Sequence, residues 1–161
     1  AAAVAGPVTR SISDFAVFRT VPDGRCLFRA LSVGAGQPES EVGADTLRSQ
    51  VIAEFRQRRE EVEWFLELPF DAYVARMARP STWGGEPELL MASHVLRKPL
   101  WVWMPGEAVD GSRYSQRLVR QACYGEDLGG EEAAIHLRYS GTHYDLLVPR
   151  GQATPPPASR L

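Results

Sequence analysis

The stretch D-G-R-C-L-F-R-A-L, from Asp23 to Leu31, joins a polar turn to the apolar start of a helix. Cys26 stands at the junction and is one of two cysteines in the chain. At a helix start, backbone N–H groups and the helix dipole stabilise a thiolate and lower the pKa of the thiol. Gly24 lets the backbone turn tightly, so N–H groups of the turn can converge on an oxyanion formed when the sulfur attacks a carbonyl. A buried, inert cysteine fits this local pattern as well, and both interpretations stay open at this point.

The composition is that of a single globular domain. Its 161 residues suffice to bury a hydrophobic core, and no apolar run approaches the ~18–20 residues of a membrane-spanning helix. The formal net charge of −2 gives no basic surface for nucleic acid or for an anionic membrane, so neither is an expected partner. Two cysteines are too few for a disulfide framework, which favours a reducing, intracellular compartment, the cytoplasm or the nucleus. The cysteines and the three histidines show no zinc-type spacing, so we expect no metal. We also expect no other cofactor and a monomeric protein.

The chain divides into one folded unit with a low-complexity segment at each end. Residues 1–13 are small and rich in alanine and are expected to be flexible, residues 14–150 to form the domain, and residues 151–161 to form a proline-rich disordered tail. Helical periodicity comes first and strand patterns follow, which indicates an α+β domain. The expected helices cover 26–33, 42–66, 69–79 and 86–97, and the expected strands cover 15–21, 100–104, 114–124, 133–139 and 143–148.

A nucleophilic cysteine needs an imidazole as its base, and the chain offers three. His94 lies in a helical pattern and suits a core or partly exposed position, whereas His136 lies in an alternating strand and suits an ordinary surface position. His143 follows a Ser-Gly-Thr turn and shares one strand face with Asp145. That carboxylate can accept the imidazole Nδ1–H and fix the orientation of the ring. Because the chain contains no asparagine, a third member of the site has to be Asp, Glu or Gln.

Three blocks, in this order, resemble the ovarian-tumour (OTU) family of cysteine proteases, which are mostly deubiquitinases. D-G-R-C-L-F-R-A-L is similar to the D-G-x-C-L-F-x-A nucleophile segment of that family. W-G-G-E-P-E-L-L-M-A-S-H-V-L-R-K-P-L-W-V-W, from Trp83 to Trp103, is similar to its W-G-x-x-x-E-L passage from helix to strand. I-H-L-R-Y-S-G-T-H-Y-D-L-L-V, from Ile135 to Val148, is similar to its closing strand with H-Y-[DN]. The blocks span nearly all of the expected domain.

The resemblance implies a papain-like cysteine-protease fold of the OTU type, α+β, with helices packed around a small, mostly antiparallel sheet. It implies that Cys26 is the nucleophile, that His143 is the general base and then acid, and that Asp145 orients the imidazole. The family also carries Asn at the place of Asp145, and Asp23 is a candidate to assist instead. The cleaved bond would be an isopeptide bond between the C-terminus of ubiquitin and a lysine, broken through a thioester and without metal. The oxyanion hole would consist of backbone N–H groups of Asp23, Gly24, Arg25 and Cys26.

The resemblance also implies a channel through which a thin, glycine-ended peptide tail reaches Cys26. For Trp83, a core anchor is the alternative role. Arg25 stands where many family members carry a smaller polar residue, and we expect it to project into solvent rather than to meet carboxylates of the substrate. The candidates for lining the channel are Trp83, Gly84, Gly85 and Tyr144.

Two other functions are compatible with these residues. One is recognition of ubiquitin with little turnover, because some cysteine-protease folds act as scaffolds. The other is the same hydrolysis acting on a different ubiquitin-like modifier, because the choice of modifier depends on a surface spread over several segments. For a deubiquitinase, the expected partner is ubiquitin or polyubiquitin, and another ubiquitin-like modifier is the alternative.

Overall fold

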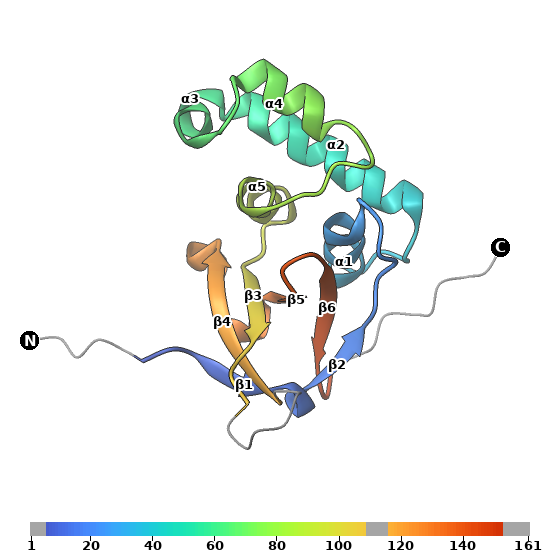
Figure 1. Ribbon diagram of the computed structural model, residues 1–161, viewed down its shortest axis with the longest axis vertical. Helices are drawn as coiled ribbons and strands as arrows, with labels where there is room; N and C mark the ends of the chain where they lie inside the picture. The colour runs from blue at the N-terminus through green and yellow to red at the C-terminus, as the bar shows by residue number, and fades with distance from the viewer. Residues whose placement is uncertain (1–5, 109–115, 153–161) are drawn as a thin grey trace, which may run out of the picture.

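Helices lie on one side of a curved sheet in the structure, a computed structural model that describes residues 6–108 and 116–152 (Figure 1). The outer layer is formed by α2, α3 and α4, whereas α1 and α5 lie between that layer and the sheet. The helices are α1 (Cys26–Gly34), α2 (Glu41–Gln57), α3 (Arg59–Val62), α4 (Phe70–Met77) and α5 (Glu86–Leu96). The strands are β1 (Thr9–Ser11), β2 (Phe15–Phe18), β3 (Leu100–Pro105), β4 (Arg117–Tyr124), β5 (Ile135–Tyr139) and β6 (Tyr144–Pro149). Short 3₁₀ turns cover Ile12–Asp14, Glu63–Phe65, Glu126–Leu128 and Glu131–Ala133.

Within the described residues, six strands form one sheet in the order β1-β4-β3-β5-β6-β2. The pair β3 and β5 is parallel, and the other neighbouring pairs are antiparallel. The strands β5 and β6 form the expected hairpin, in which Arg138 lies opposite Asp145. This arrangement confirms the α+β class and the small, mostly antiparallel sheet.

Strand β3 supplies apolar side chains to both faces of the sheet. Leu100 and Val102 belong to the main core beside the helices, whereas Trp101 and Trp103 belong to a second cluster on the other face. Because successive side chains of a strand alternate between faces, the run L-W-V-W serves both clusters. Phe15 of β2 covers the second face, with its ring centroid 6.0 Å from that of Trp103.

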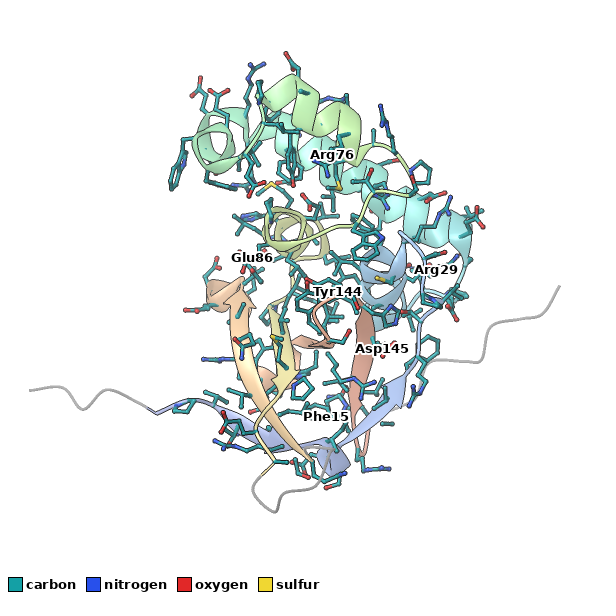
Figure 2. The ribbon with its side chains drawn as sticks, viewed as in Figure 1. Phe15, Arg29, Arg76, Glu86, Tyr144 and Asp145 are labelled. Carbon is teal, nitrogen blue, oxygen red and sulfur yellow. The ribbon has the colours of Figure 1, made fainter. Side chains whose placement is uncertain are left out.

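Helix α1 lies in the centre of the main core. Every residue from Cys26 to Val33 is buried, and the helix contacts α2 on one side and β6 on the other. Its apolar side chains stabilise this position by about 25 cal/mol for each Å² of apolar surface that they bury. Figure 2 shows Tyr144 and Asp145 of β6 beside this helix. The packing therefore brings the cysteine to the strand that follows His143.

The single helix expected over 42–66 is instead broken at Arg58. Helix α2 ends just before it, and α3 and the 3₁₀ turn at Glu63–Phe65 follow. Arg58 leaves helical geometry, with φ −107° and ψ 24°, and its guanidinium binds Glu54 and Glu61 on the two sides of the break. The charged run around Arg58 has no continuous apolar stripe that could hold a straight helix against the core.

Part of the segment expected to be flexible, residues 1–13, is a strand. Strand β1 pairs with Arg117–Val119 of β4, and Ser11 then caps a 3₁₀ turn. A strand of three residues is too short to produce a recognisable alternating pattern. The alanine-rich composition therefore predicted flexibility for a segment that contains a strand. Residues 1–5 and 153–161 of the expected flexible ends, and residues 114–115 of one expected strand, lie outside the described residues. In the described part of the chain, no helix combines the length and apolar character needed to cross a membrane.

Candidate active site

The sulfur of Cys26 lies where the start of α1 meets the start of β6. Cys26 is the first residue of α1 and is 7% exposed. The backbone N–H groups of Leu27, in the helix, and of Tyr144, the first residue of β6, lie close enough to its sulfur to lower the pKa of the thiol. The nearness of Tyr144 places the thiol beside the chain neighbour of His143, as a cysteine–histidine site requires.

The pKa of the Cys26 thiol is raised, contrary to the expectation from its place at a helix start. Burial is the largest cause, because it disfavours the charged thiolate. The N–H groups of Tyr144 and Leu27 lower the pKa by less than burial raises it, and the carboxylates of Asp23 and Asp145 raise it further. The sulfur is therefore a thiol at neutral pH in this state, and its reaction needs a base that takes the proton.

We expect the rate at which iodoacetamide alkylates Cys26 to keep rising at pH values where the rate for an ordinary thiol has levelled off. In a Cys123→Ser background, the rate should still rise above pH ~8.5, the pKa of a free cysteine. The folded state holds the thiol proton more tightly than the unfolded chain does, so this group lowers the free energy of unfolding as pH rises above that value. The unfolded chain in denaturant supplies the reference titration. If the pH midpoint of alkylation were lower in the folded protein than in the unfolded chain, the helix start would lower the pKa of Cys26 by more than burial raises it.

His143 and Asp145 form a hydrogen-bonded pair at the start of β6. Nε2 of His143 lies 2.9 Å from Oδ1 of Asp145. The two side chains meet as their spacing predicts, but through Nε2 rather than through the expected Nδ1. Since the carboxylate occupies Nε2, Nδ1 is the ring nitrogen left to receive the proton of a thiol.

Two residues that the sequence analysis missed hold Asp145. The backbone N–H of Thr20 donates to Oδ1 and Nη2 of Arg138 donates to Oδ2, each over 3.0 Å. Burial alone would raise the pKa of Asp145, but the bonds from Thr20, Arg138 and His143 outweigh it and hold the pKa below its ordinary value. Asp145 is thus a carboxylate at neutral pH. The register of the hairpin could have pointed to Arg138, whereas Thr20 lies 125 residues away in the sequence and belongs to no motif.

Asp23, the alternative to Asp145, binds within its own turn. Its Oδ2 lies 2.9 Å from Nη2 of Arg29, and its Oδ1 accepts the backbone N–H of Arg25. Burial raises the pKa of Asp23, and the bonds from Arg29 and Arg25 lower it by more, so the group stays ionised. The contact with His143 belongs to Asp145, and Asp23 instead fixes the turn that precedes Cys26.

The side chain of Arg25 does not project into solvent as the sequence predicted. Its Nε lies 2.8 Å from Oδ1 of Asp45, and its Nη2 lies 3.2 Å from Oε1 of Glu41. Both partners are on α2, and the Arg25 side chain is only 19% exposed. These ion pairs attach the turn to α2, a connection that local sequence does not reveal because the partners lie on another element.

Three of the four N–H groups expected to form an oxyanion hole, those of Asp23, Arg25 and Cys26, are bonded within the turn. The N–H of Asp23 donates to the carbonyl of Val21, and the N–H of Cys26 donates to the carbonyl of Asp23. The N–H of Arg25 donates to the side chain of Asp23. A Cβ added at Gly24 would lie 2.4 Å from the carbonyl oxygen of Ser81, so only glycine permits this close approach. At Asp23, Arg25 and Cys26 a substrate oxyanion would therefore compete with internal acceptors.

Arg48 of α2, also missed by the sequence analysis, fastens this turn to the segment before Trp83. It is 2% exposed, and its guanidinium carbon lies 4.3 Å from the ring centroid of Phe28. The guanidinium donates to four backbone carbonyls over 2.9–3.0 Å, and no carboxylate lies among these acceptors. A charged residue inside an apolar stripe gives no sequence signal of such a role. The acceptors are the carbonyl oxygens of Gly24, Met77, Pro80 and Thr82.

Trp83, Gly84 and Gly85 line a groove of about 590 Å³ whose other residues come mainly from α4, α5 and the end of β4. Trp83 is 63% exposed, so the alternative role as a core anchor is wrong. Gly84 lies directly on α1, because an added Cβ would be 2.7 Å from Cδ2 of Leu27. The side chains described along the groove do not include Cys26.

Tyr144, the fourth candidate for the channel, lies outside this groove. It is 7% exposed and stacks on Tyr139 with ring centroids 4.5 Å apart. Its backbone serves both sides of the site: its N–H lowers the pKa of the Cys26 thiol, and its carbonyl accepts the hydroxyl of Thr20 over 2.7 Å. Tyr144 therefore serves the site through its main chain.

His136 is buried rather than exposed, which corrects the expectation of a surface position. It is 1% exposed. The Nε1–H of Trp103 donates a hydrogen bond to Nδ1 of His136 over 3.0 Å. Since an indole N–H can only donate, Nε2 carries the proton and donates to the carbonyl of Glu131 over 2.9 Å. Burial lowers the pKa of His136, so the ring is neutral and structural. His94 is half-buried on α5, as expected.

Sequence comparisons relate the chain to known enzymes. Residues 21–145 match the family model described as OTU-like cysteine protease. Over 94% of its length the chain is 38% identical to "OVARIAN TUMOR DOMAIN-containing deubiquitinating enzyme 4" of Arabidopsis thaliana, and it covers 49% of that protein. Over 88% of its length it is 32% identical to "OVARIAN TUMOR DOMAIN-containing deubiquitinating enzyme 3" of the same plant, and it covers 71% of that protein. The chain thus spans about half the length of the first of these relatives.

Solved structures share the fold. The Hazara virus OTU bound to ubiquitin superposes with a TM-score of 0.75 at 23% identity, covering 91% of this chain and 89% of that one. The OTU domain of OTUD1 gives a TM-score of 0.67 at 23% identity, covering 84% of this chain and 86% of that one. At these identities the likeness concerns the fold, which is of the papain-like OTU type.

Proposed function

Because this chain belongs to the family of OTU-like cysteine proteases, we propose that it is a deubiquitinating cysteine protease. It hydrolyses peptide and isopeptide bonds after the C-terminal glycine of ubiquitin. The observation that carries the proposal is the packing of α1, which begins with Cys26, against β6, where the backbone of Tyr144 lies close enough to influence the thiol and His143 binds Asp145. A thiol, an imidazole and a carboxylate drawn from the two ends of the domain supply the parts of a thiol protease.

The reaction proceeds through a thioester. Nδ1 of His143 takes the proton of Cys26 while the sulfur attacks the carbonyl carbon of the last glycine of ubiquitin. The imidazolium then donates this proton to the leaving lysine amine as the C–N bond breaks. In the second half, His143 takes a proton from water, the oxygen adds to the thioester carbon, and the C–S bond breaks. The imidazolium returns the proton to the sulfur, so that the thiol and the neutral imidazole are restored.

The surrounding residues assist both halves of the reaction. Asp145 orients the imidazole and stabilises the imidazolium through the bond to Nε2. The oxyanion docks against the turn from Asp23 to Cys26, where the N–H of Cys26 exchanges the carbonyl of Asp23 for the charged oxygen, a stronger acceptor. Asp23 contributes by keeping this turn in place.

The groove beside Trp83 is the proposed path of the ubiquitin tail. Gly85 leaves this path open, because a Cβ added there would meet nothing nearer than Oε1 of Glu88 at 4.0 Å. Gly84 lets the path lie directly on α1, the helix that begins with Cys26. A tail that ends in glycine carries no side chain at its last residue and can therefore approach this surface closely.

The proposal extends to the domain, its partner and its location. Residues 14–150 form the catalytic domain, with β1 added at the edge of its sheet. The partner is ubiquitin or polyubiquitin. The protein acts inside the cell, in the cytoplasm or the nucleus, since Cys26 and Cys123 are both free thiols and a reducing compartment keeps them so.

Hydrolysis of defined conjugates tests the function. We expect the chain to release ubiquitin from linkage-defined diubiquitins and from ubiquitin with a C-terminal fluorogenic amide. Matched fluorogenic amides of other ubiquitin-like modifiers should react more slowly. Binding of diubiquitin without release of ubiquitin would mean a binding domain, and release only from another modifier would mean a different hydrolase. Either outcome would contradict the proposal.

A further inference from the structure

Thr20 contacts both members of the His143–Asp145 pair. Its backbone N–H donates to Oδ1 of Asp145 over 3.0 Å, and its Oγ1 lies 3.2 Å from Nε2 of His143. The same Oγ1 lies 2.7 Å from the carbonyl oxygen of Tyr144. Thr20 is 5% exposed, so its hydroxyl is shielded from water that could take over these bonds.

The protons of this cluster can be assigned from its donors and acceptors. The carbonyl of Tyr144 can only accept, so the single hydroxyl proton of Thr20 points to it. The lone pairs of Oγ1 are then what faces Nε2 of His143. On its other side Nε2 faces Oδ1 of Asp145, which is ionised and can also only accept. Two acceptors converge on Nε2, so the imidazole proton sits there and Nδ1 keeps its lone pair.

We propose that Thr20 is a positioning residue of the reaction, whose hydroxyl, oriented by the carbonyl of Tyr144, accepts the Nε2–H of His143 and fixes the tautomer that leaves Nδ1 as the base. The inference rests on the proposed function for its effect on turnover, but the tautomer itself is independent of any substrate. The hydroxyl matters most when His143 is an imidazolium. A hydrogen bond from a charged donor is stronger than one from a neutral donor, so the hydroxyl stabilises the imidazolium more than the neutral imidazole.

The variant Thr20→Val tests the hydroxyl alone. Valine keeps the shape of threonine and its backbone N–H, so the bond to Asp145 remains while the acceptor for Nε2 and the donor for Tyr144 are lost. We expect kcat on the fluorogenic ubiquitin amide to fall by roughly 10- to 100-fold, the value of one hydrogen bond to a charged group, with KM nearly unchanged. Thr20→Ser restores a hydroxyl and should recover most of the lost kcat.

A matched control separates this effect from the loss of any hydroxyl–carbonyl bond. Ser49→Ala removes such a bond, from Oγ of Ser49 to the carbonyl of Asp45 over 3.0 Å, on the exposed face of α2. It should leave kcat unchanged. Thermal melting of each variant identifies any loss of kcat that comes from unfolding. An unchanged kcat in folded Thr20→Val, or a serine variant as slow as the valine variant, would overturn the proposal.

The tautomer supplies a second readout that does not depend on activity. In the unsubstituted protein with ¹⁵N-labelled histidine, two-bond ¹H–¹⁵N correlations should show that the neutral ring of His143 is protonated at Nε2 and unprotonated at Nδ1. His143→Gln identifies the signals by their disappearance. A proton on Nδ1 would overturn the inference even if the enzyme is active. Absence of hydrolysis together with the Nε2–H tautomer would refute the proposed function and leave the assignment of the tautomer standing.

Discussion

A Cys26→Ala variant is expected to lose hydrolysis of ubiquitin conjugates by at least about 10⁴-fold while it keeps its fold. Without the sulfur no thioester forms, and removal of the nucleophile of a protease costs about 10⁶-fold in kcat. Alanine replaces a buried cysteine by a slightly smaller side chain, so the loss in the free energy of unfolding should be about 1 kcal/mol. Initial rates on the fluorogenic ubiquitin amide, with thermal melting of the same samples, measure both quantities.

The second thiol supplies the control for this experiment. Cys123 lies on β4 and packs against the second cluster, on the face of the sheet away from the helices. Cys123→Ser should therefore keep its activity close to that of the unsubstituted chain. If Cys26→Ala retained a rate within ten-fold of the original, a nucleophile other than Cys26 would have to be responsible.

An Arg48→Met variant is expected to lose about 3–5 kcal/mol of unfolding free energy, as when one side of a buried polar cluster is removed. Methionine keeps an apolar stem against Phe28, but the four carbonyls that the guanidinium serves lose their donor. Each buried acceptor without a partner costs about 1–3 kcal/mol, and relief of the buried charge offsets part of the sum. Urea unfolding followed by circular dichroism measures the loss, which corresponds to a fall in Tm of roughly 6–20 °C.

The same helix provides a comparison for Arg48. Arg56 lies on the exposed face of α2, and Arg56→Met should change the free energy of unfolding by no more than about 0.5 kcal/mol. Loss of the bond to the carbonyl of Gly24 also frees the turn before Cys26, so Arg48→Met should be slower at temperatures where it is still folded. Equal stability of the two variants would mean that the four carbonyls find other donors or water.

The parts of the site that lie within a few residues of one another were predictable from the sequence. D-G-R-C-L-F-R-A-L predicted a turn and a helix start because the turn residues and the apolar residues are contiguous. The pairing of His143 with Asp145 followed from the alternation of a strand, although the alternation could not say that Nε2 makes the contact. The hairpin of β5 and β6 carried enough pattern to be found, including its turn.

The residues that hold the site together were not predictable, because their partners are distant in the sequence. Thr20 and Arg48 act through backbone carbonyls and N–H groups, which any sequence supplies and which only the fold brings into reach. Burial raises the pKa of Cys26 by more than the N–H groups at the helix start lower it. The extent of burial could not be predicted from the local sequence. His136 looked like a surface residue because its strand alternates, but both faces of the sheet are covered.

Covalent capture tests the assignment of the nucleophile most directly. Ubiquitin whose C-terminal carboxyl is replaced by a thiol-reactive electrophile is incubated with the folded chain, and the product is analysed by intact mass and peptide mapping. If Cys26 is the nucleophile of a deubiquitinase, one ubiquitin becomes attached to each chain and the modified residue is Cys26. No adduct with the folded chain, or an adduct on Cys123, would contradict this assignment.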